Sequence, residues 1–265
     1  MLDSIHDNLR SRYNPDGSEL RQLQLRMLEI LIEVDAICKR HNIKYWLSSG
    51  TLLGAVRHGG FIPWDDDLDI EIMREDYTRL MTILPKELPA HLVLQTDQTD
   101  ANYVYLYSKV RDMNSYIKEE CVVNQRLKHQ GAFVDIFPME TAPHILCGIS
   151  AKLFNRLCLK QAIERGCHTA LYKWARTFLL SVLFPLFRII SKGYTKAKIH
   201  HTYGVNFLIP VNVEDVFPLT TVDFEGHSFP APQSSDKYLT ALYGDYMKIP
   251  EEIVYHRVEN SIKVW

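Results

Sequence analysis

Apolar and polar positions along the first half of the chain alternate with two different periods. Between residues 18 and 41 the apolar residues recur every three or four positions, which predicts a helix that ends near Asn42. Residues 68–72 alternate strictly, as is typical of a strand with one buried face. Shorter patterns predict strands at 43–47, 91–96, 103–110 and 132–137, and helices at 51–57 and 75–84, closed by Gly59–Gly60 and by Pro85 respectively.

The second half of the chain is predominantly helical by the same criterion. Residues 151–199 predict helices, and Pro185 must end or kink one of them because proline lacks an amide hydrogen. The tail that follows is rich in proline and aromatic residues until a short predicted helix at 234–243. We therefore expect an α/β (α+β) chain with a mixed-sheet core at residues 1–142. A helical region and loop-rich tail, residues 143–265, should pack on that core as one compact unit.

The most apolar stretch, residues 174–190, is too interrupted to predict a transmembrane helix. A span needs about 20 consecutive, mainly apolar residues, and this stretch contains Arg176, Pro185 and Arg188. We expect a buried helix here. The alternative is an amphipathic segment lying on a membrane surface, because a lysine-rich run follows it at residues 192–198.

Composition and charge narrow the class of protein. With 46% hydrophobic and 23% charged residues the chain is an ordinary globular one. Its 30 Lys and Arg against 32 Asp and Glu give a net charge of −2, so we expect no nucleic-acid partner. The five cysteines form no Cys-x-x-Cys pair, and the first seven residues have no apolar core. These features favour reduced thiols and a cytoplasmic location, with peripheral attachment to the cytoplasmic face of the inner membrane as the alternative.

The acids are concentrated in one cluster, where four of the five residues from Asp65 to Asp69 are aspartates. Because extended residues alternate faces, Asp67, Asp69 and Glu71 should share one side, whereas Asp66 should face away and bind no metal. Two such carboxylates can hold a divalent cation, and oxygen ligands favour Mg²⁺ or Mn²⁺. A solvated acidic turn is the alternative. An EF-hand is excluded, since an isoleucine stands where that loop needs glycine.

A further carboxylate, Asp135, is embedded in the apolar run Phe133–Phe137. A charge flanked by apolar residues is rarely buried without a partner. We expect Asp135 to complete the metal site begun by Asp65, Asp67 and Asp69. A structural aspartate held by hydrogen bonds is the alternative.

Upstream of the cluster, Ser48, Ser49, Gly50 and Thr51 stand between a predicted strand and a predicted helix. The free amides of a helix start, with neighbouring hydroxyls, can receive a phosphate, although the same residues also serve as ordinary caps. No P-loop and no dinucleotide-binding glycine motif is present. A metal site close to a phosphate cradle predicts phosphoryl transfer.

The run WLSSGTLLGAVRHGGFIPWDDDLDI at residues 46–70 resembles the LicD family of phosphocholine transferases. The fukutin-related ribitol-phosphate transferases are similar in the same stretch. Tail segments at 217–219, 224–226, 229–232 and 243–250 also resemble the LicD family, whereas residues 143–209 resemble it only loosely.

The resemblance implies a nucleotidyltransferase-like (polymerase-β-like) fold, Mg²⁺ dependence and a CDP-activated donor. It places the family's Asp-x-Asp pair on Asp67 and Asp69, with Asp65 in the same motif, its Gly-Ser element on Ser49, Gly50 and Thr51, and its later strand aspartate on Asp135. In the implied mechanism, Asp67 and Asp69 bind Mg²⁺ on the diphosphate of CDP-choline. Asp135 ligates metal, takes the proton of the acceptor hydroxyl, or does both. Lys109 and Arg111 are candidates for neutralising donor phosphate, with a solvated strand face as the alternative.

Choline recognition would need an aromatic cage or a carboxylate, and our candidates are Tyr243, Asp245 and Tyr246. The leading hypothesis is transfer of phosphocholine to a hydroxyl of a cell-surface glycan or glycolipid, such as lipopolysaccharide or teichoic acid, with release of CMP. Transfer of ribitol phosphate, glycerol phosphate or a nucleotide is the first alternative. A non-catalytic metal- or glycan-binding module is the second, against which the intact aspartate trio argues.

Overall fold

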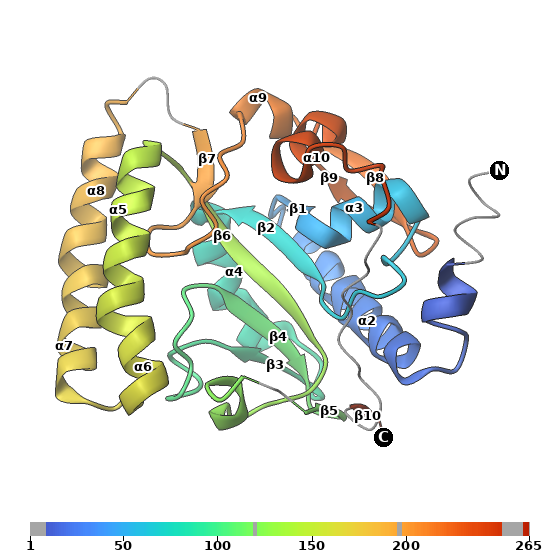
Figure 1. The fold of residues 1–265 in the computed structure, drawn as a ribbon, viewed down its shortest axis with the longest axis horizontal. Helices are drawn as coiled ribbons and strands as arrows, with labels where there is room; N and C mark the ends of the chain where they lie inside the picture. Colours follow the sequence, from blue (N-terminus) through green and yellow to red (C-terminus); the bar gives the residue numbers. More distant parts are fainter. Residues whose placement is uncertain (1–8, 119–120, 195–197, 251–261, 265) are drawn as a thin grey trace.

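The computed structural model describes residues 9–118, 121–194, 198–250 and 262–264. Its centre is a mixed sheet in which β2 runs parallel to β6 and the other neighbours are antiparallel (Figure 1). The strands in spatial order are β1 (Tyr45–Leu47), β2 (Asp69–Met73), β6 (Phe133–Ala142), β4 (Ser108–Asp112) and β3 (Leu92–Gln95), with β7 (Lys198–His201) pairing with the far half of β6.

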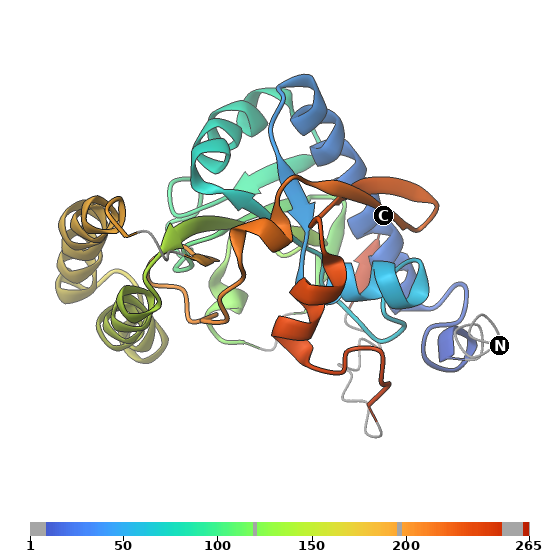
Figure 2. The ribbon, with the colours of Figure 1, turned by 90° about the horizontal axis from the view of Figure 1, so that it is seen from above.

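Two helices, α2 (Glu19–Arg40) and α4 (Arg74–Glu87), cover one face of this sheet (Figure 2). Helix α2 begins where Ser18 accepts a hydrogen bond from the amide of Arg21 at 3.1 Å. Its apolar stripe joins the main core together with Ile70 and Ile72, the inward residues of β2. Since side chains of a strand alternate, this leaves Asp69 and Glu71 on the opposite face.

Above that opposite face and beside β1 lie segments from two distant parts of the chain (Figures 1 and 2). They are α3 (Ser49–His58), which Gly59 ends in the left-handed conformation, α9 (Val213–Val216), the hairpin β8 (Thr220–Phe224) and β9 (His227–Ala231), and α10 (Ser235–Tyr243). A small separate pair joins β5 (Ser115–Ile117) to β10 (Ile262–Val264), and the short helix η1 spans Asn124–Arg126.

A helical layer, defined here as residues 144–194, stands at one edge of the molecule, beside β6 and β7 (Figure 2). It has its own apolar core, separate from the main one. Its elements are α5 (His144–Phe154), the π-helical turn η2 (Asn155–Leu159), α6 (Lys160–Arg165), α7 (Ala170–Phe178), the π-helical turn η3 (Leu179–Leu183) and α8 (Phe184–Ser191).

The mixed α/β class and most predicted elements are confirmed, with five corrections. Helix α4 continues past Pro85 to Glu87, although Pro85 has no amide hydrogen to donate to the preceding turn. Residues 103–107 precede β4 and are not part of a strand. Helix was predicted as far as residue 199, but α8 ends at Ser191 and residues 198–199 belong to strand β7. The hairpin β8–β9 was missed, since proline obscures its alternation.

The fifth correction concerns residues 174–190. The continuous helical segment Ala170–Ser191 is long and apolar enough to cross a membrane. Of its 18 most apolar consecutive residues, only 22% are buried. The prediction of a buried helix is therefore wrong. This segment packs on the protein along one side and exposes apolar residues along the other.

Candidate active site

Three charged residues meet on the face of the sheet opposite α2 and α4. Asp69 of β2 is the register partner of Asp135 of β6, which in turn is the register partner of Lys109 of β4. Register partners share a face of a sheet, so the three side chains lie side by side. One step further along, Glu71 is the register partner of Phe137.

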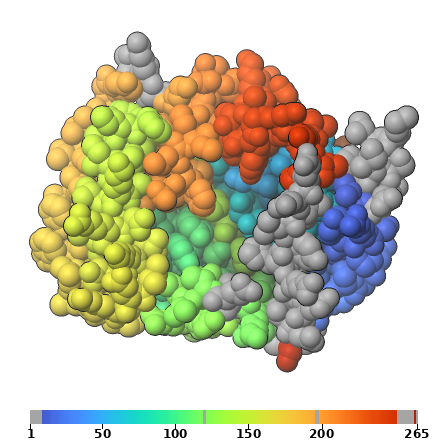
Figure 3. Space-filling model, in the orientation of Figure 1, coloured from blue at the N-terminus to red at the C-terminus, as the bar shows by residue number. Residues whose placement is uncertain are grey.

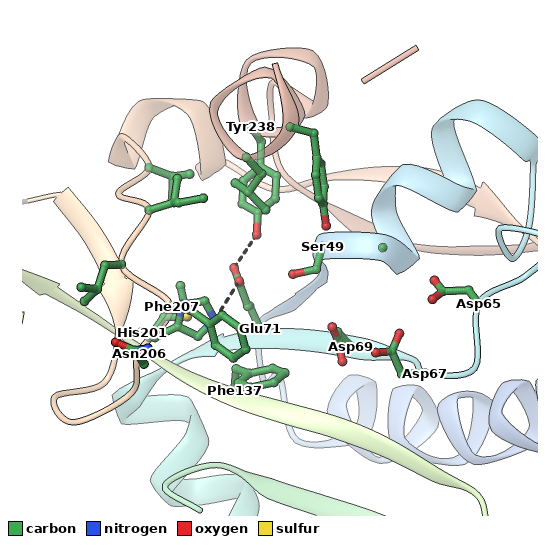
Figure 4. A pocket seen from close by; sticks show the side chains of 17 residues that line it. Ser49, Asp65, Asp67, Asp69, Glu71, Phe137, His201, Asn206, Phe207 and Tyr238 are labelled. Carbon is green, nitrogen blue, oxygen red and sulfur yellow. Dashed lines mark hydrogen bonds and ion pairs between the residues drawn. The ribbon is translucent and has the colours of Figure 1, made fainter. Parts of the chain in front are cut away.

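A cavity of about 530 Å³ opens over this face (Figure 4). One end holds the start of α3 and the carboxylates of Asp65, Asp67 and Asp69. The other end holds Glu71 among aromatic and apolar side chains. The lining of that second end comes from β2, β6, β7, α10 and the loop after β7: Glu71, Phe137, Met139, His201, Asn206, Phe207, Leu208, Ile209, Val211, Tyr238 and Leu242.

The aspartates of the first end destabilise one another's charged forms. Burial raises the pKa of Asp69 well above its usual range, and the charges of Asp67, Asp135 and Asp65 raise it further. Burial likewise raises the pKa of Asp65, with the charge of Asp67 next in importance and a hydrogen bond between the two carboxyl groups contributing. Neither Asp66 nor Asp135 lines the cavity itself.

This donor set fits a divalent cation with a preference for oxygen. Mutual repulsion of carboxylates is what a bound cation relieves, and Asp65, Asp67 and Asp69 all face the cavity. Within the described ranges, however, no three His, Cys, Asp or Glu side chains already meet in a group that could hold a metal. A cation would therefore have to draw the carboxylates together, displacing the contact between Asp65 and Asp67.

Asp135 already has a partner in this structure. The Nζ of Lys109 lies 2.6 Å from its Oδ1 and 2.8 Å from its Oδ2, and both residues are buried. The ammonium also lies 3.6 Å from the centre of the Phe133 ring. Burial raises the pKa of Asp135, while Lys109 opposes that shift. The sequence made Lys109 a candidate for the donor phosphate, with a solvated strand face as the alternative, and the structure pairs it with this aspartate.

The start of α3 has the features of an anion site. Ser48 is fully buried, and its hydroxyl has no hydrogen-bond partner among the described residues. No side chain caps the helix, so its first amides stay available. A Cβ on Gly50 would lie 2.7 Å from Oδ2 of Asp65, so only glycine lets this carboxylate lie against the helix start. Ser49 adopts the left-handed conformation, with φ 47°.

Two of the predicted phosphate ligands have other roles here. The hydroxyl of Thr51 is buried and accepts a hydrogen bond from the amide of Asp69 at 2.8 Å, which joins α3 to the end of β2. Arg111 is fully buried, donates from Nε to Gln95 at 2.7 Å and from Nη1 to the carbonyl of Gly131 at 2.8 Å. These contacts hold both side chains away from the cavity. Thr51 and Arg111 therefore help to position the sheet and do not face a donor.

The three predicted choline ligands are not brought together. Tyr243 lines the cavity, but beside Ser49, with which it shares a hydrogen bond at the aspartate end. Tyr246 lies outside the cavity and donates to Asp236 at 2.9 Å, and Asp245 is exposed. Since two of the three residues do not line the cavity, this assignment is corrected.

The aromatic end of the cavity contains the residues that sequence reasoning missed. Glu71 is 1% exposed and accepts hydrogen bonds from Trp46 at 2.8 Å and Tyr238 at 2.9 Å. Burial nevertheless raises its pKa to about 7. His201 lies 3.4 Å from the second oxygen of Glu71, and burial lowers its pKa to about 4, so the ring is neutral.

Three rings surround this carboxylate at steep mutual angles. Phe137 meets His201 at 5.3 Å and 89°, and Phe207 at 6.0 Å and 87°. Alternate residues of a strand share a face, so Glu71 lies on the same face of β2 as Asp69. For the same reason Phe137 lies on the same face of β6 as Asp135. These two were accessible to sequence reasoning, whereas Phe207 and Tyr238 come from remote segments without such a signal.

A mixed sheet with aspartates at the end of β2, a matching aspartate on β6 and a phosphate-type helix start defines a nucleotidyltransferase-like domain. Residues 42–149 match the family model for the LicD/FKTN/FKRP nucleotidyltransferase domain.

Similarity to one characterised protein extends beyond the domain. The chain is 28% identical to the lipopolysaccharide cholinephosphotransferase LicD of Haemophilus influenzae over 256 residues, 88% of this chain and 93% of that protein. It is 53% identical over 83 residues to the uncharacterized protein RP689 of Rickettsia prowazekii, 31% of this chain and 30% of that one. A shorter match, 49% over 43 residues, covers 16% of this chain and 9% of human ribitol 5-phosphate transferase FKRP.

Proposed function

We propose that this protein is a phosphotransferase that moves phosphocholine from CDP-choline to a hydroxyl of a cell-surface glycan or glycolipid and releases CMP. The observation that carries the proposal is that one cavity has two ends of different chemistry. Carboxylates and a helix start suit a diphosphate at one end, and a carboxylate among aromatic rings suits a quaternary ammonium at the other. The similarity to a cholinephosphotransferase over most of both chains supports the same assignment.

The diphosphate of the donor would bind at the start of α3. The amides of the first turn would be the main donors. The buried hydroxyl of Ser48, which has no hydrogen-bond partner in the part of the chain that the structure describes, would be a further one. Mg²⁺ or Mn²⁺, held by Asp67 and Asp69 with Asp65 beside them, would neutralise the diphosphate and the departing CMP. Tyr243 closes this end of the cavity over Ser49.

Asp135 would act as the base toward the acceptor, because it is the register partner of Asp69, which lines the cavity. The acceptor oxygen attacks the choline-bearing phosphorus, the bond from that phosphorus to CMP breaks, and the hydroxyl proton passes to Asp135. A buried carboxylate with a raised pKa is a better proton acceptor than one in water. Lys109, in contact with both of its oxygens, fixes its orientation and stabilises its charged form.

The head group would lie against Glu71. A trimethylammonium group offers no hydrogen-bond donors and is recognised by aromatic faces and negative charge. Phe137, His201 and Phe207 supply rings, and the neutral state of His201 avoids repulsion of a cation. Ribitol or glycerol phosphate would need several hydroxyl partners, whereas the lining here is mostly apolar.

The experiment is release of CMP from three donors, CDP-choline, CDP-ribitol and CDP-glycerol, with Mg²⁺ and a glycan acceptor. The proposal predicts turnover with CDP-choline and at least about tenfold lower kcat/KM with the other two, because neither places a cation beside Glu71. Preference for CDP-ribitol or CDP-glycerol would reassign the head group and keep the chemistry. Absence of turnover with every donor would favour the non-catalytic module.

A further inference from the structure

The helical layer, residues 144–194, exposes an unusual amount of apolar surface. Of the 21 large apolar side chains that are exposed in the described part of the chain, 12 lie in these 51 residues. A soluble monomer rarely gathers exposed apolar residues in this way. They are Ile145, Ile149, Leu157, Ile163, Leu171, Trp174, Phe178, Val182, Leu186, Ile189, Ile190 and Tyr194.

Along α7, η3 and α8 these residues form one stripe. Trp174, Phe178, Val182 and Leu186 follow one another at intervals of four, which keeps them on one side of a helix. Trp174 is 67% exposed and its ring stacks on that of Phe178 at 5.8 Å. The opposite side of the same helices is buried in the core of the layer, through Tyr172, Ala175, Leu179 and Phe184.

The layer also differs from the rest of the chain in charge. Residues 144–194 contain eight Lys and Arg and a single acid, Glu164, although the chain as a whole has a net charge of −2. Six of the eight are exposed: Lys152, Arg156, Lys160, Arg165, Lys173 and Lys192. An exposed apolar stripe on a layer with an excess of positive charge is complementary to an anionic lipid surface.

We propose that the helical layer binds an anionic membrane surface, with the stripe from Trp174 to Ile190 inserted among the lipid head groups. The helices lie in the plane of the interface and do not cross the bilayer. Arg176 contacts Asp97 at 2.9 Å and Arg188 contacts Glu140 at 2.7 Å, and these ion pairs fasten α7 and α8 to the rest of the protein. A spanning orientation would break both.

This surface is connected to the cavity by the loop after β7. Leu208 packs on the core of the helical layer, while its neighbours Phe207 and Ile209 line the cavity and are exposed. The space-filling view shows the layer forming one whole flank of the molecule (Figure 3). Docking of that flank would bring the rim of the cavity toward the lipid surface, where a glycolipid acceptor is anchored.

The test is co-flotation of the full chain with vesicles of phosphatidylglycerol and phosphatidylcholine in equal parts, compared with phosphatidylcholine alone. We expect binding to the anionic vesicles that weakens as salt is added. The variant Phe178→Ser/Val182→Ser should lose it, whereas Leu25→Ser/Val122→Ser, which removes exposed apolar residues elsewhere, should not. Each exposed cation should contribute roughly fivefold to binding, so Lys152→Gln/Arg156→Gln should bind less well than Lys86→Gln/Lys128→Gln.

Trp174 supplies a second readout that does not depend on a variant that folds poorly. Lipids carrying a quencher should reduce its fluorescence in the wild type, and the quenching should disappear in Trp174→Phe. The proposal is overturned if no vesicle is bound, or if Phe178→Ser/Val182→Ser binds like the wild type. It is also overturned if sedimentation shows a dimer that the same substitution dissociates, because the stripe would then contact a second copy of the chain.

Discussion

Asp69 and Asp135 are register partners on the parallel strands β2 and β6, so a half-buried and a buried carboxylate lie side by side on one face of the sheet. Burial raises the pKa of both carboxyl groups. The charges of Asp67, Asp135 and Asp65 raise the pKa of Asp69 further, and the charge of Asp67 raises that of Asp135. Lys109, the register partner of Asp135 on the other side, offsets part of this repulsion. The remaining repulsion is what a bound cation or a protonated carboxyl must relieve.

The contact between Lys109 and Asp135 should be strongly coupled. Lys109→Met leaves the carboxylate of Asp135 buried without its partner and should lower the free energy of unfolding by about 3–5 kcal/mol. Lys109→Met/Asp135→Asn should recover most of that loss, since neither charge remains. Urea unfolding of the single and double variants measures the coupling. Additive effects of the two substitutions would contradict the buried ion pair.

Gly50 should be required for the position of Asp65. In Gly50→Ala the new Cβ would meet Oδ2 of Asp65 at 2.7 Å, so the carboxylate must move away from the start of α3. We expect turnover to fall by at least about tenfold. Gly148→Ala in α5 is the control, because no atom lies within 4 Å of its Cβ, and it should stabilise the helix by about 0.5–1 kcal/mol. Unimpaired turnover in Gly50→Ala would contradict the close approach.

Glu71 should determine the choice of head group. Glu71→Gln keeps hydrogen-bonding capacity toward Trp46 and Tyr238 but removes the charge. The KM for CDP-choline should rise about tenfold, while kcat/KM for a CDP-alditol, whose head group carries no charge, should stay the same or rise. Val213→Ala, an exposed apolar residue that does not line the cavity, is a control for general effects. Equal losses with both kinds of donor would assign Glu71 a structural role only.

Glu140 should make the stability of the protein sensitive to acid. It joins β6 to α8 through two contacts with Arg188, at 2.7 and 2.8 Å. The hydrogen bonds and charge of Arg188 outweigh burial and lower the pKa of Glu140 below 4.5. A lowered carboxyl pKa contributes stability above pH 4.5 that is lost as the pH falls through the folded-state value.

Glu140→Gln should therefore cost about 1–3 kcal/mol at pH 7 and less at pH 3. Urea unfolding of the wild type and the variant across this range measures the difference. Since only the wild type can lose the charge, its stability should fall more steeply below pH 4.5. A difference between the two proteins that is constant with pH would show that Glu140 is not the titrating group.

Periodicity and local chemistry predicted much of the fold. Helix α2 followed from the spacing of its apolar residues, β2 from alternation, and the first half of β6 from a short apolar run. Asp135 was recognisable because a lone charge in an apolar run needs a partner. The sequence could not reveal which partner, because strand register brings Lys109 beside it from 26 positions away.

Other features depend on packing between remote segments. Glu71 lies in the cavity because α10 supplies Tyr238 and the loop after β7 supplies Phe207. The exposure of the stripe from Trp174 to Ile190 is likewise invisible to composition, since a buried helix and an interfacial one have similar hydropathy. Domain limits, the bound metal and the location in the cell stay predictions.

The most direct test of the proposed function is release of CMP from CDP-choline in Mg²⁺ by three proteins: the wild type, Asp69→Asn and Asp66→Asn. Asp69 lines the cavity and Asp66 does not. The account predicts turnover by the wild type and by Asp66→Asn, and a loss of at least about 100-fold in Asp69→Asn. Folding of Asp69→Asn, checked by thermal unfolding without metal, should be intact or improved, because a repelled charge is removed. Full turnover by a folded Asp69→Asn would contradict the account.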